Sequence, residues 1–243
     1  MVMSVIRFLT TVLLTVVGIY SLSSVQGDLP LIALLIPALW LYPQSGVYGI
    51  LLIVAMSAYG LALPLQELAL SISTWILFPI LMVAFDSKST KVVKILLGIC
   101  VMAMYTGIIL AQVDGKVTGS AGATVVQLLS VTLIWYVAMN WRSSPAHSWG
   151  ALLFIIPMWI AGLQFAAMVA LSVTGIISVS ESLKKIGELD WSKLIYWALP
   201  TVGFAALILN PEVEIPDQVL VAWIFMLGAA WATDYFLSME TLE

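Results

Sequence analysis

Apolar side chains fill long stretches of this chain instead of marking one face of each helix. The stretch from Val92 to Val113 is apolar on every side of a helix, as expected for a segment surrounded by lipid. A strand of a membrane β-barrel would alternate apolar and polar residues instead. Because unpaired backbone groups are costly in hydrocarbon, this pattern predicts membrane-spanning α-helices.

The apolar stretches recur along the whole sequence, and only short polar segments separate them. About 20 helical residues cross the roughly 30 Å hydrocarbon core of a bilayer. We therefore expect one all-α, polytopic membrane bundle over residues 1–243, with about eight or nine transmembrane segments and no second domain. The predicted segments are 5–25, 29–42, 46–63, 66–85, 92–113, 120–140, 149–178, 193–209 and 218–238.

Two parts of this pattern are irregular. Segments 29–42 and 46–63 are each shorter than a full crossing, and the intervening Pro43-Gln44-Ser45-Gly46 must break a helix, which gives either two short tilted helices or one broken element. Segment 149–178 is longer than one crossing. Pro157 and Gly162 make it either a single span or a broken, re-entrant element.

Basic residues predict the orientation of the chain, because they gather in short cytoplasmic loops. With the N-terminus in the cytoplasm, only Lys116 among the basic residues before position 148 falls outside. The cytoplasmic residues are then Arg7, Lys88, Lys91, Lys94 and Arg142.

In the second half of the chain, the side on which the lysines lie depends on the path of segment 149–178. A continuous 149–178 span would place Lys184, Lys185 and Lys193 outside, whereas a break near Gly162 would return them to the cytoplasm and put the acidic 210–217 loop outside. The objection is length, because two halves of about 14 residues barely cross the core. The sequence leaves both paths open.

Composition agrees with a membrane protein of the cell (inner, cytoplasmic) membrane. Apolar residues make up 62% of the chain and charged residues 9%, whereas a soluble domain has about half and a quarter. The net charge of −4 offers no basic surface for nucleic acid. The start of the chain, with Arg7 before the apolar run 8–19, also fits a cleavable signal peptide, but we expect an uncleaved first helix.

The residue types needed by many membrane enzymes are scarce. Cys100 is the single cysteine and His147 the single histidine, which excludes haem held by two histidines, di-iron centres and HExxH zinc sites. No lysine or arginine lies mid-span, which argues against a retinal Schiff base and a voltage sensor. We expect neither a metal nor a cofactor.

One enzyme class can be compared directly with the sequence, the intramembrane serine hydrolases. Ser120 and His147 could supply a nucleophile and a base. However, Gly119-Ser120-Ala121-Gly122 does not follow the G-x-S-G order of those enzymes, and His147 follows Pro145 in a basic loop. We therefore predict no catalytic residues.

Polar side chains within apolar helices are the best candidates for a ligand site. An amide in hydrocarbon needs a partner, which is either another helix or a ligand. Gln164 lies beside the expected break, and Trp159 and Gln127 are expected at a similar depth. Glu67 and Asp234, close to helix ends, lie either at the interface or in a cavity. Uncharged groups of this kind suit a neutral or zwitterionic solute.

Residues 178–190 differ from the rest of the chain. Ser178 and Glu181 have the spacing of a capping box, and Val179, Leu183 and Ile186 recur at helical intervals. This pattern predicts a short interfacial helix. Its lysines, with the next one along the chain, would contact lipid headgroups or a partner protein: Lys184, Lys185 and Lys193.

Two functions remain. A transporter, or the membrane-embedded subunit of one, predicts a cavity bordered by Gln127 or Gln164. A non-catalytic subunit or scaffold of a larger membrane complex predicts a solid interior. Under either function the lipid bilayer surrounds the chain, a partner subunit or a second copy is expected, and any ATPase must be a separate chain.

Overall fold

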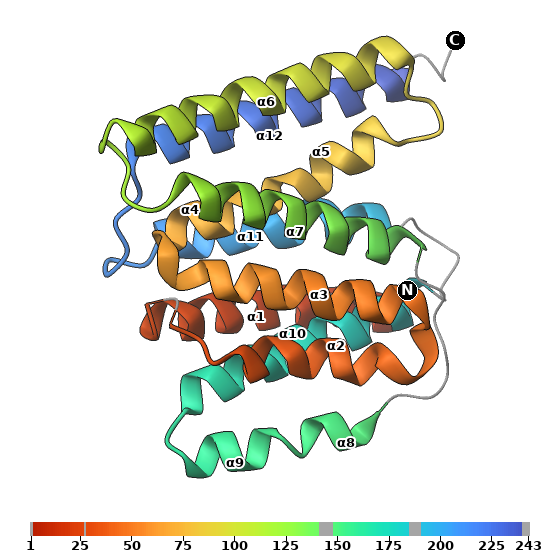
Figure 1. The fold of residues 1–243 in the computed structure, drawn as a ribbon. Coiled ribbons are helices and arrows are strands. Elements are labelled where there is room, and N and C mark those ends of the chain that lie inside the picture. Colours follow the sequence, from red (N-terminus) through yellow and green to blue (C-terminus); the bar gives the residue numbers. More distant parts are fainter. Residues whose placement is uncertain (1, 27, 141–147, 185–190, 240–243) are drawn as a thin grey trace.

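The fold is all-helical, as the sequence predicts. The structure is a computed structural model and describes residues 2–26, 28–140, 148–184 and 191–239. Within these ranges the only strand-like pairing is an isolated antiparallel bridge between Gln66 and Gly119. The helices run side by side, parallel or antiparallel to one another, in the manner of a membrane bundle (Figure 1).

The α-helices are α1 (Val2–Ser24), α2 (Leu31–Ser45), α3 (Val47–Ala62), α4 (Leu68–Ser73), α5 (Leu77–Ala84), α6 (Lys91–Val113), α7 (Ala121–Asn140), α8 (Trp149–Leu152), α9 (Ile155–Ile160), α10 (Gln164–Lys184), α11 (Trp191–Ile208) and α12 (Asp217–Met239). Two 3-10 turns, η1 (Leu63–Leu65) and η2 (Thr74–Ile76), lie on either side of α4.

Six of the described helices are long and apolar enough to cross a membrane, which marks a multi-pass membrane protein. Four further apolar helices are shorter: Leu31–Leu41, Leu68–Ala84, Trp149–Ile160 and Lys193–Ile208. The predicted count of eight or nine spans is therefore not confirmed, because full-length and short helices both contribute to the bundle. The full-length helices are Val2–Ser24, Val47–Leu65, Lys91–Val113, Ala121–Asn140, Gln164–Leu183 and Asp217–Met239.

The 29–63 region forms two helices joined by a turn, the short α2 and the full-length α3, and not one broken span. Gly46, with φ of +53°, reverses the chain between α2 and α3. The two helices then pack against each other in opposite directions (Figure 1). A Cβ atom at Gly60 would lie 2.6 Å from Leu34 Cδ1, so this glycine permits their close approach.

The 149–178 region is a broken element and not a single span, which were the two alternatives predicted from the sequence. The chain turns at residues 161–163, where Gly162 has φ of +81°, and returns as α10. α10 continues through Ser178 to Lys184, so Ser178 does not begin a separate interfacial helix; residues 185–190 lie outside the described residues. The length objection fails for α10, which has 21 residues. The limb at 149–160 is short, about 18 Å of helix.

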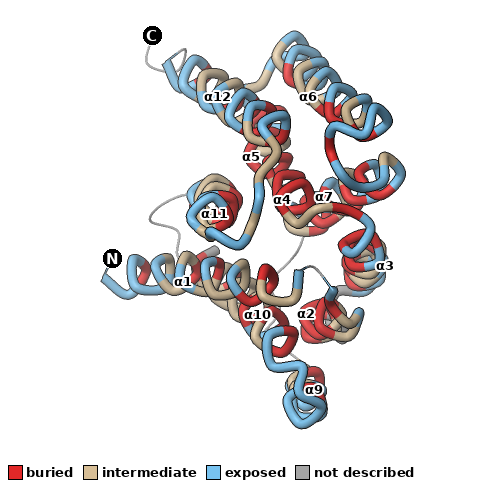
Figure 2. Tube along the Cα trace, turned by 90° about the vertical axis from the view of Figure 1, so that its left-hand side faces the viewer, coloured by how far each residue is buried: buried red, intermediate tan, exposed pale blue. Residues whose placement is uncertain are grey.

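Seven packed elements form a closed ring, seen from one end of the bundle in Figure 2. Each element contacts the next in the order α1, α10, α2, α3, α7, the broken helix α4–α5, and α11, which returns to α1. α6 and α12 pair outside one side of this ring, and α8 and α9 lie against α10 and α2 on another. The broken helix at residues 68–84 is buried along almost its whole length.

Basic residues gather at one end of the bundle, where α1, α6 and α11 begin and where α10 and α12 end (Figure 1). Lys116, in the turn after α6, lies at the opposite end. The broken 149–184 element therefore brings the lysines of the second half to the same end as those of the first. The described basic residues at this end are Arg7, Lys88, Lys91, Lys94, Lys184 and Lys193.

Candidate functional site

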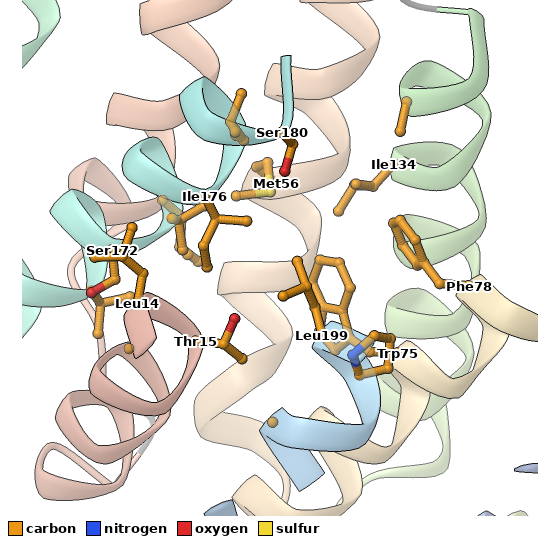
Figure 3. Close-up of a pocket in the computed structure, with 18 of the residues that line it drawn as sticks. Leu14, Thr15, Met56, Trp75, Phe78, Ile134, Ser172, Ile176, Ser180 and Leu199 are labelled. Carbon is orange, nitrogen blue, oxygen red and sulfur yellow. The ribbon is translucent and has the colours of Figure 1, made fainter. Parts of the chain in front are cut away.

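A long apolar cavity of about 310 Å³ lies inside the ring of helices (Figure 3). Leucine, isoleucine, valine and methionine side chains from all seven elements of the ring form most of its wall. Along α10 the lining runs from Val169 to Glu181, which is about 18 Å of helix. The cavity is therefore elongated along the axis of the bundle.

Close packing of α1 against α10 closes one side of the cavity. A Cβ atom at Gly175 would lie 2.8 Å from Leu14 Cδ1, and one at Gly18 would lie 3.2 Å from Ser172 Cβ. Small residues at such positions let two membrane helices approach closely. These glycines thus let α1 and α10 form a continuous wall on this side of the cavity.

The opposite wall carries a tyrosine and a tryptophan whose polar atoms are already paired. Trp75 Nε1 donates to Tyr59 Oη at 2.9 Å, and Tyr59 Oη donates to the Ser71 carbonyl at 3.0 Å. The two rings meet edge to face, with centroids 5.7 Å apart. This wall therefore offers mainly carbon surface to the cavity.

The break within helix 68–84 places polar groups on the side of this wall that faces away from the cavity, while the side that lines the cavity stays apolar. Ser73 Oγ and Thr74 Oγ1 donate to the carbonyls of Leu70 and Ser71, each at 2.7 Å, and such bonds compete with regular helix. The helix tightens to 3-10 at η2, just before Pro79 in α5. Tyr59 and Tyr105 donate to carbonyls in this turn, which keeps its backbone paired inside the bundle.

The polar end of the cavity lies at the C-terminal end of α10. Ser180 Oγ is buried without a hydrogen-bond partner among the described residues, and Figure 3 shows it directed into the cavity. Glu181, which is only 7% exposed, lines the cavity beside it. At the other end, Leu22, Leu29 and Leu63 line the cavity near the turns that connect α1 to α2 and α3 to α4.

Behind the Tyr59–Trp75 wall lies a second polar group, here called the glutamine cluster: Gln66, Ser71, Gln112, Thr124 and Gln127. Gln66 Nε2 donates to Gln127 Oε1 and to Ser71 Oγ (3.2 Å). Gln127 Nε2 donates to Ser71 Oγ at 3.0 Å. Thr124 Oγ1 lies 2.8 Å from Gln66 Oε1 and 2.9 Å from Gln112 Oε1, and its single hydrogen serves one of them at a time.

The glutamine cluster connects α4, α6 and α7 through side chains that would be costly in lipid alone. Its members are at most 9% exposed, and Gln112 Nε2 has no partner among the described residues. Ser120 N donates to the Leu65 carbonyl at 3.1 Å, which fastens the turn after α6 to the start of the broken helix. The cluster is a helix-to-helix contact and does not border the cavity.

The residues predicted to form one ligand site are dispersed. Gln127 is fully buried in the glutamine cluster, Gln164 is exposed at the start of α10, and Trp159 is 50% exposed on α9. None of them lines this cavity, so it is not the cavity bordered by Gln127 or Gln164 that the sequence predicts. The reason is that α10 turns Gln164 outward, while Gln127 finds partners on α4 and its flanking residues.

The predicted charged residues lie at helix ends. Glu67 precedes α4 and accepts a hydrogen bond from Thr118 Oγ1. Asp234 pairs with Lys193 at 2.5 Å, which joins α12 to α11. Lys184 is the last residue of α10, and Lys185 and His147 lie outside the described residues. No group of three Asp, Glu, Cys or His side chains that could hold a metal occurs in the described part of the chain.

The α10 lining of the cavity is not among the sites predicted from the sequence, although the sequence carries a signal for it. Its lining residues follow the helical period and make one continuous face, Val169, Ser172, Val173, Ile176, Ile177, Ser180 and Glu181. The polar character of Ser180 and Glu181 suggests a membrane surface, whereas in the structure they continue this face.

No known protein family, curated protein or solved structure matches this chain.

Proposed function

We propose that this protein is a membrane carrier, or the membrane-embedded subunit of one, whose cargo is an uncharged and mainly apolar molecule. The observation that supports it is the central cavity, about 310 Å³ and enclosed by helices that meet in a ring. Ligand sites in proteins begin at roughly this volume and are lined mainly by apolar and aromatic side chains. A scaffold with a solid interior would have no need of this space.

The lining favours an apolar cargo over the zwitterionic one that the glutamines suggest. The amides of Gln66 and Gln127 are engaged between helices and are not presented to the cavity. A zwitterion in this cavity would leave its hydration shell and find few hydrogen-bond partners in return.

The charge distribution supports an orientation for this carrier. The end of the bundle with Arg7, Lys88, Lys91 and Lys94 faces the cytoplasm under the positive-inside rule, with the chain in the cell (inner) membrane. Both the start of α1 and the end of α12 lie at that end (Figure 1).

The test is mass spectrometry of the full chain, extracted gently from its native membrane, for retained small molecules and partner proteins together. Ile176→Trp would fill the cavity, because Ile176 lines it. Leu171→Trp is the matched control, because Leu171 lies on the same helix, is 44% exposed and does not line the cavity.

We expect an apolar molecule to be retained by the unaltered chain and by Leu171→Trp, and its retention to fall about tenfold in Ile176→Trp. Equal retention by both variants would contradict the proposal. A stoichiometric partner protein with no retained molecule would favour the scaffold instead.

A further inference from the structure

We infer that the cargo is an elongated, neutral lipid with one uncharged polar group at its end, a hydroxyl or a carbonyl, which pairs with Ser180. This inference rests on the proposed function and names the class of molecule that the cavity takes. It also assigns the direction in which that molecule lies.

The Ser180 hydroxyl is buried and unpaired. Ser180 Oγ has no hydrogen-bond partner in the described part of the chain, and Figure 3 shows it directed into the cavity. Elsewhere on α10, Thr174 Oγ1 donates to the Ala170 carbonyl at 2.7 Å. Ser182 Oγ likewise donates to the Ser178 carbonyl at 3.0 Å. Because Ser180 makes no such bond within its own helix, a bound molecule can satisfy its hydroxyl.

The other hydroxyl and indole groups of the cavity wall are bonded within the protein or packed between helices. Thr15 Oγ1 donates to a carbonyl one turn earlier in α1 at 2.8 Å, and the polar atoms of Tyr59 and Trp75 pair with each other. Ser172 is 2% exposed and faces Gly18 in the contact between α1 and α10. A molecule with polar groups along its length would therefore strand them, whereas one with a single polar end would not.

The polar group of the cargo is uncharged. Ser180 supplies one hydroxyl, which both donates and accepts, so it pairs with a hydroxyl or with a carbonyl. An ammonium, carboxylate or phosphate group loses far more hydration on entering an apolar space, and one hydroxyl does not replace it. Ser180 thus selects for the presence of a polar group and not for a donor over an acceptor.

The position of Ser180 sets the direction of the molecule. Ser180 lies within the last two turns of α10, at the end of the bundle that carries most of the basic residues. The lining extends from there for about 18 Å along α10. The opposite end of the cavity is lined by leucines near the turns after α1 and α3: Leu22, Leu29 and Leu63. The hydrocarbon part of the cargo therefore lies toward these leucines.

The experiment uses the full chain in lipid nanodiscs and three probes of equal length, an alcohol, a methyl ketone and an alkane. Each probe is made with a photoactivatable diazirine either beside the polar end or at the far end, and for the alkane at one end. Crosslinked peptides are identified by mass spectrometry at equal mole fractions of probe in the lipid.

We expect the polar probes to label one end of the cavity according to where the diazirine lies. A diazirine beside the polar end should label residues 177–181 of α10, and one at the far end should label the segments around Leu22 and Leu29. The alkane should label both ends alike. The polar probes should also bind with about fivefold higher apparent affinity than the alkane, as expected for one neutral hydrogen bond.

A substitution at Ser180 assigns this direction to its hydroxyl. In Ser180→Ala the alcohol and the ketone should label both ends, as the alkane does in the unaltered chain. Ser182→Ala is the matched control, because Ser182 lies on the same helix, bonds to the Ser178 carbonyl and does not line the cavity. It should leave the direction of all probes unchanged. The comparison of the alcohol with the alkane needs no substitution and remains informative if Ser180→Ala alters packing.

The outcomes separate the two proposals. Labelling of both ends by all three probes would overturn the pairing with Ser180 and leave the apolar carrier intact. A direction that persists in Ser180→Ala would also overturn that pairing. Absence of labelling in the cavity by every probe, the alkane included, would overturn the proposed function itself.

Discussion

At the residue scale, Gly119 determines how closely the turn after α6 can approach the broken helix. Its φ of +116° is a conformation that side chains with a Cβ rarely adopt. A Cβ atom there would lie 2.5 Å from Gln66 Cβ and 2.9 Å from Gln66 Cα. Since one of these atoms is backbone, a rotamer change cannot relieve the contact. The glutamine cluster therefore depends on the absence of a side chain at this position.

Gly119→Ala is expected to destabilise the protein by at least about 2 kcal/mol, from the combined strain of the backbone and the contact with Gln66. Gly115→Ala is the control, because Gly115 has φ of +71° but a Cβ atom added there would meet nothing within 4 Å. It carries only the backbone strain, about 1 kcal/mol. Thermal unfolding in one detergent compares the two, and equal losses would show that the contact with Gln66 is unimportant.

At the element scale, the sequence predicts helices well and their partners poorly. The break at Gly162 and the two separate helices that meet at Gly46 are among the predicted alternatives, because glycine and proline leave local signals. Of these two helices only α2 is short, since α3 continues to Leu65 as a full-length helix. The predicted helix start at Ser178 is wrong, because the capping-box spacing of Ser178 and Glu181 occurs here within α10. Polar residues that face an internal cavity have the same hydropathy as residues that face water.

The same limit applies to the candidate site. The sequence predicts that Gln127 bonds either to a helix or to a ligand, but it does not identify the partner Gln66, because the two are 61 positions apart. The cavity forms because seven elements that are far apart in the sequence meet in a ring. A local sequence pattern carries no information about such contacts, so the cavity could not be predicted.

Gln127→Leu tests the glutamine cluster as a connection between helices. This substitution removes the amide that accepts from Gln66 Nε2 and donates to Ser71 Oγ. We therefore expect the free energy of unfolding to fall by about 1 kcal/mol, which is typical of an interhelical hydrogen bond in a membrane. Gln164→Leu, at an exposed position, should change stability little. Retention of the cargo should be unaffected by Gln127→Leu, since Gln127 does not line the cavity. Reduced retention in a folded variant would place the cluster in the binding site.

At the scale of the whole molecule, the broken 149–184 element decides which side each later loop occupies. Because the chain returns as α10, Ser182 lies at the end of the bundle where α1 begins, and Val213 lies at the opposite end, between α11 and α12. The lysines and the acidic 210–217 loop are thereby separated.

Cysteine labelling in a Cys100→Ala background tests this arrangement with a reagent that does not cross the membrane. Ser182→Cys should label from the same side as Ser87→Cys, an exposed reference in the turn before α6, and Val213→Cys only from the other side. Labelling of Ser182→Cys and Val213→Cys from one side would contradict this topology.

The short limb formed by α8 and α9 has a consequence for the bilayer around it. Trp149 and Trp159 are 71% and 50% exposed near its two ends, about 15 Å apart along the helix axis, and tryptophans of this kind settle at the level of the headgroups. The limb is thus shorter than the hydrocarbon it faces, so lipid beside it must thin or the limb must recruit a neighbour to cover the difference. We therefore expect hydrophobic mismatch along this one edge, with the acyl chains beside α8 and α9 more disordered than those beside the full-length helices.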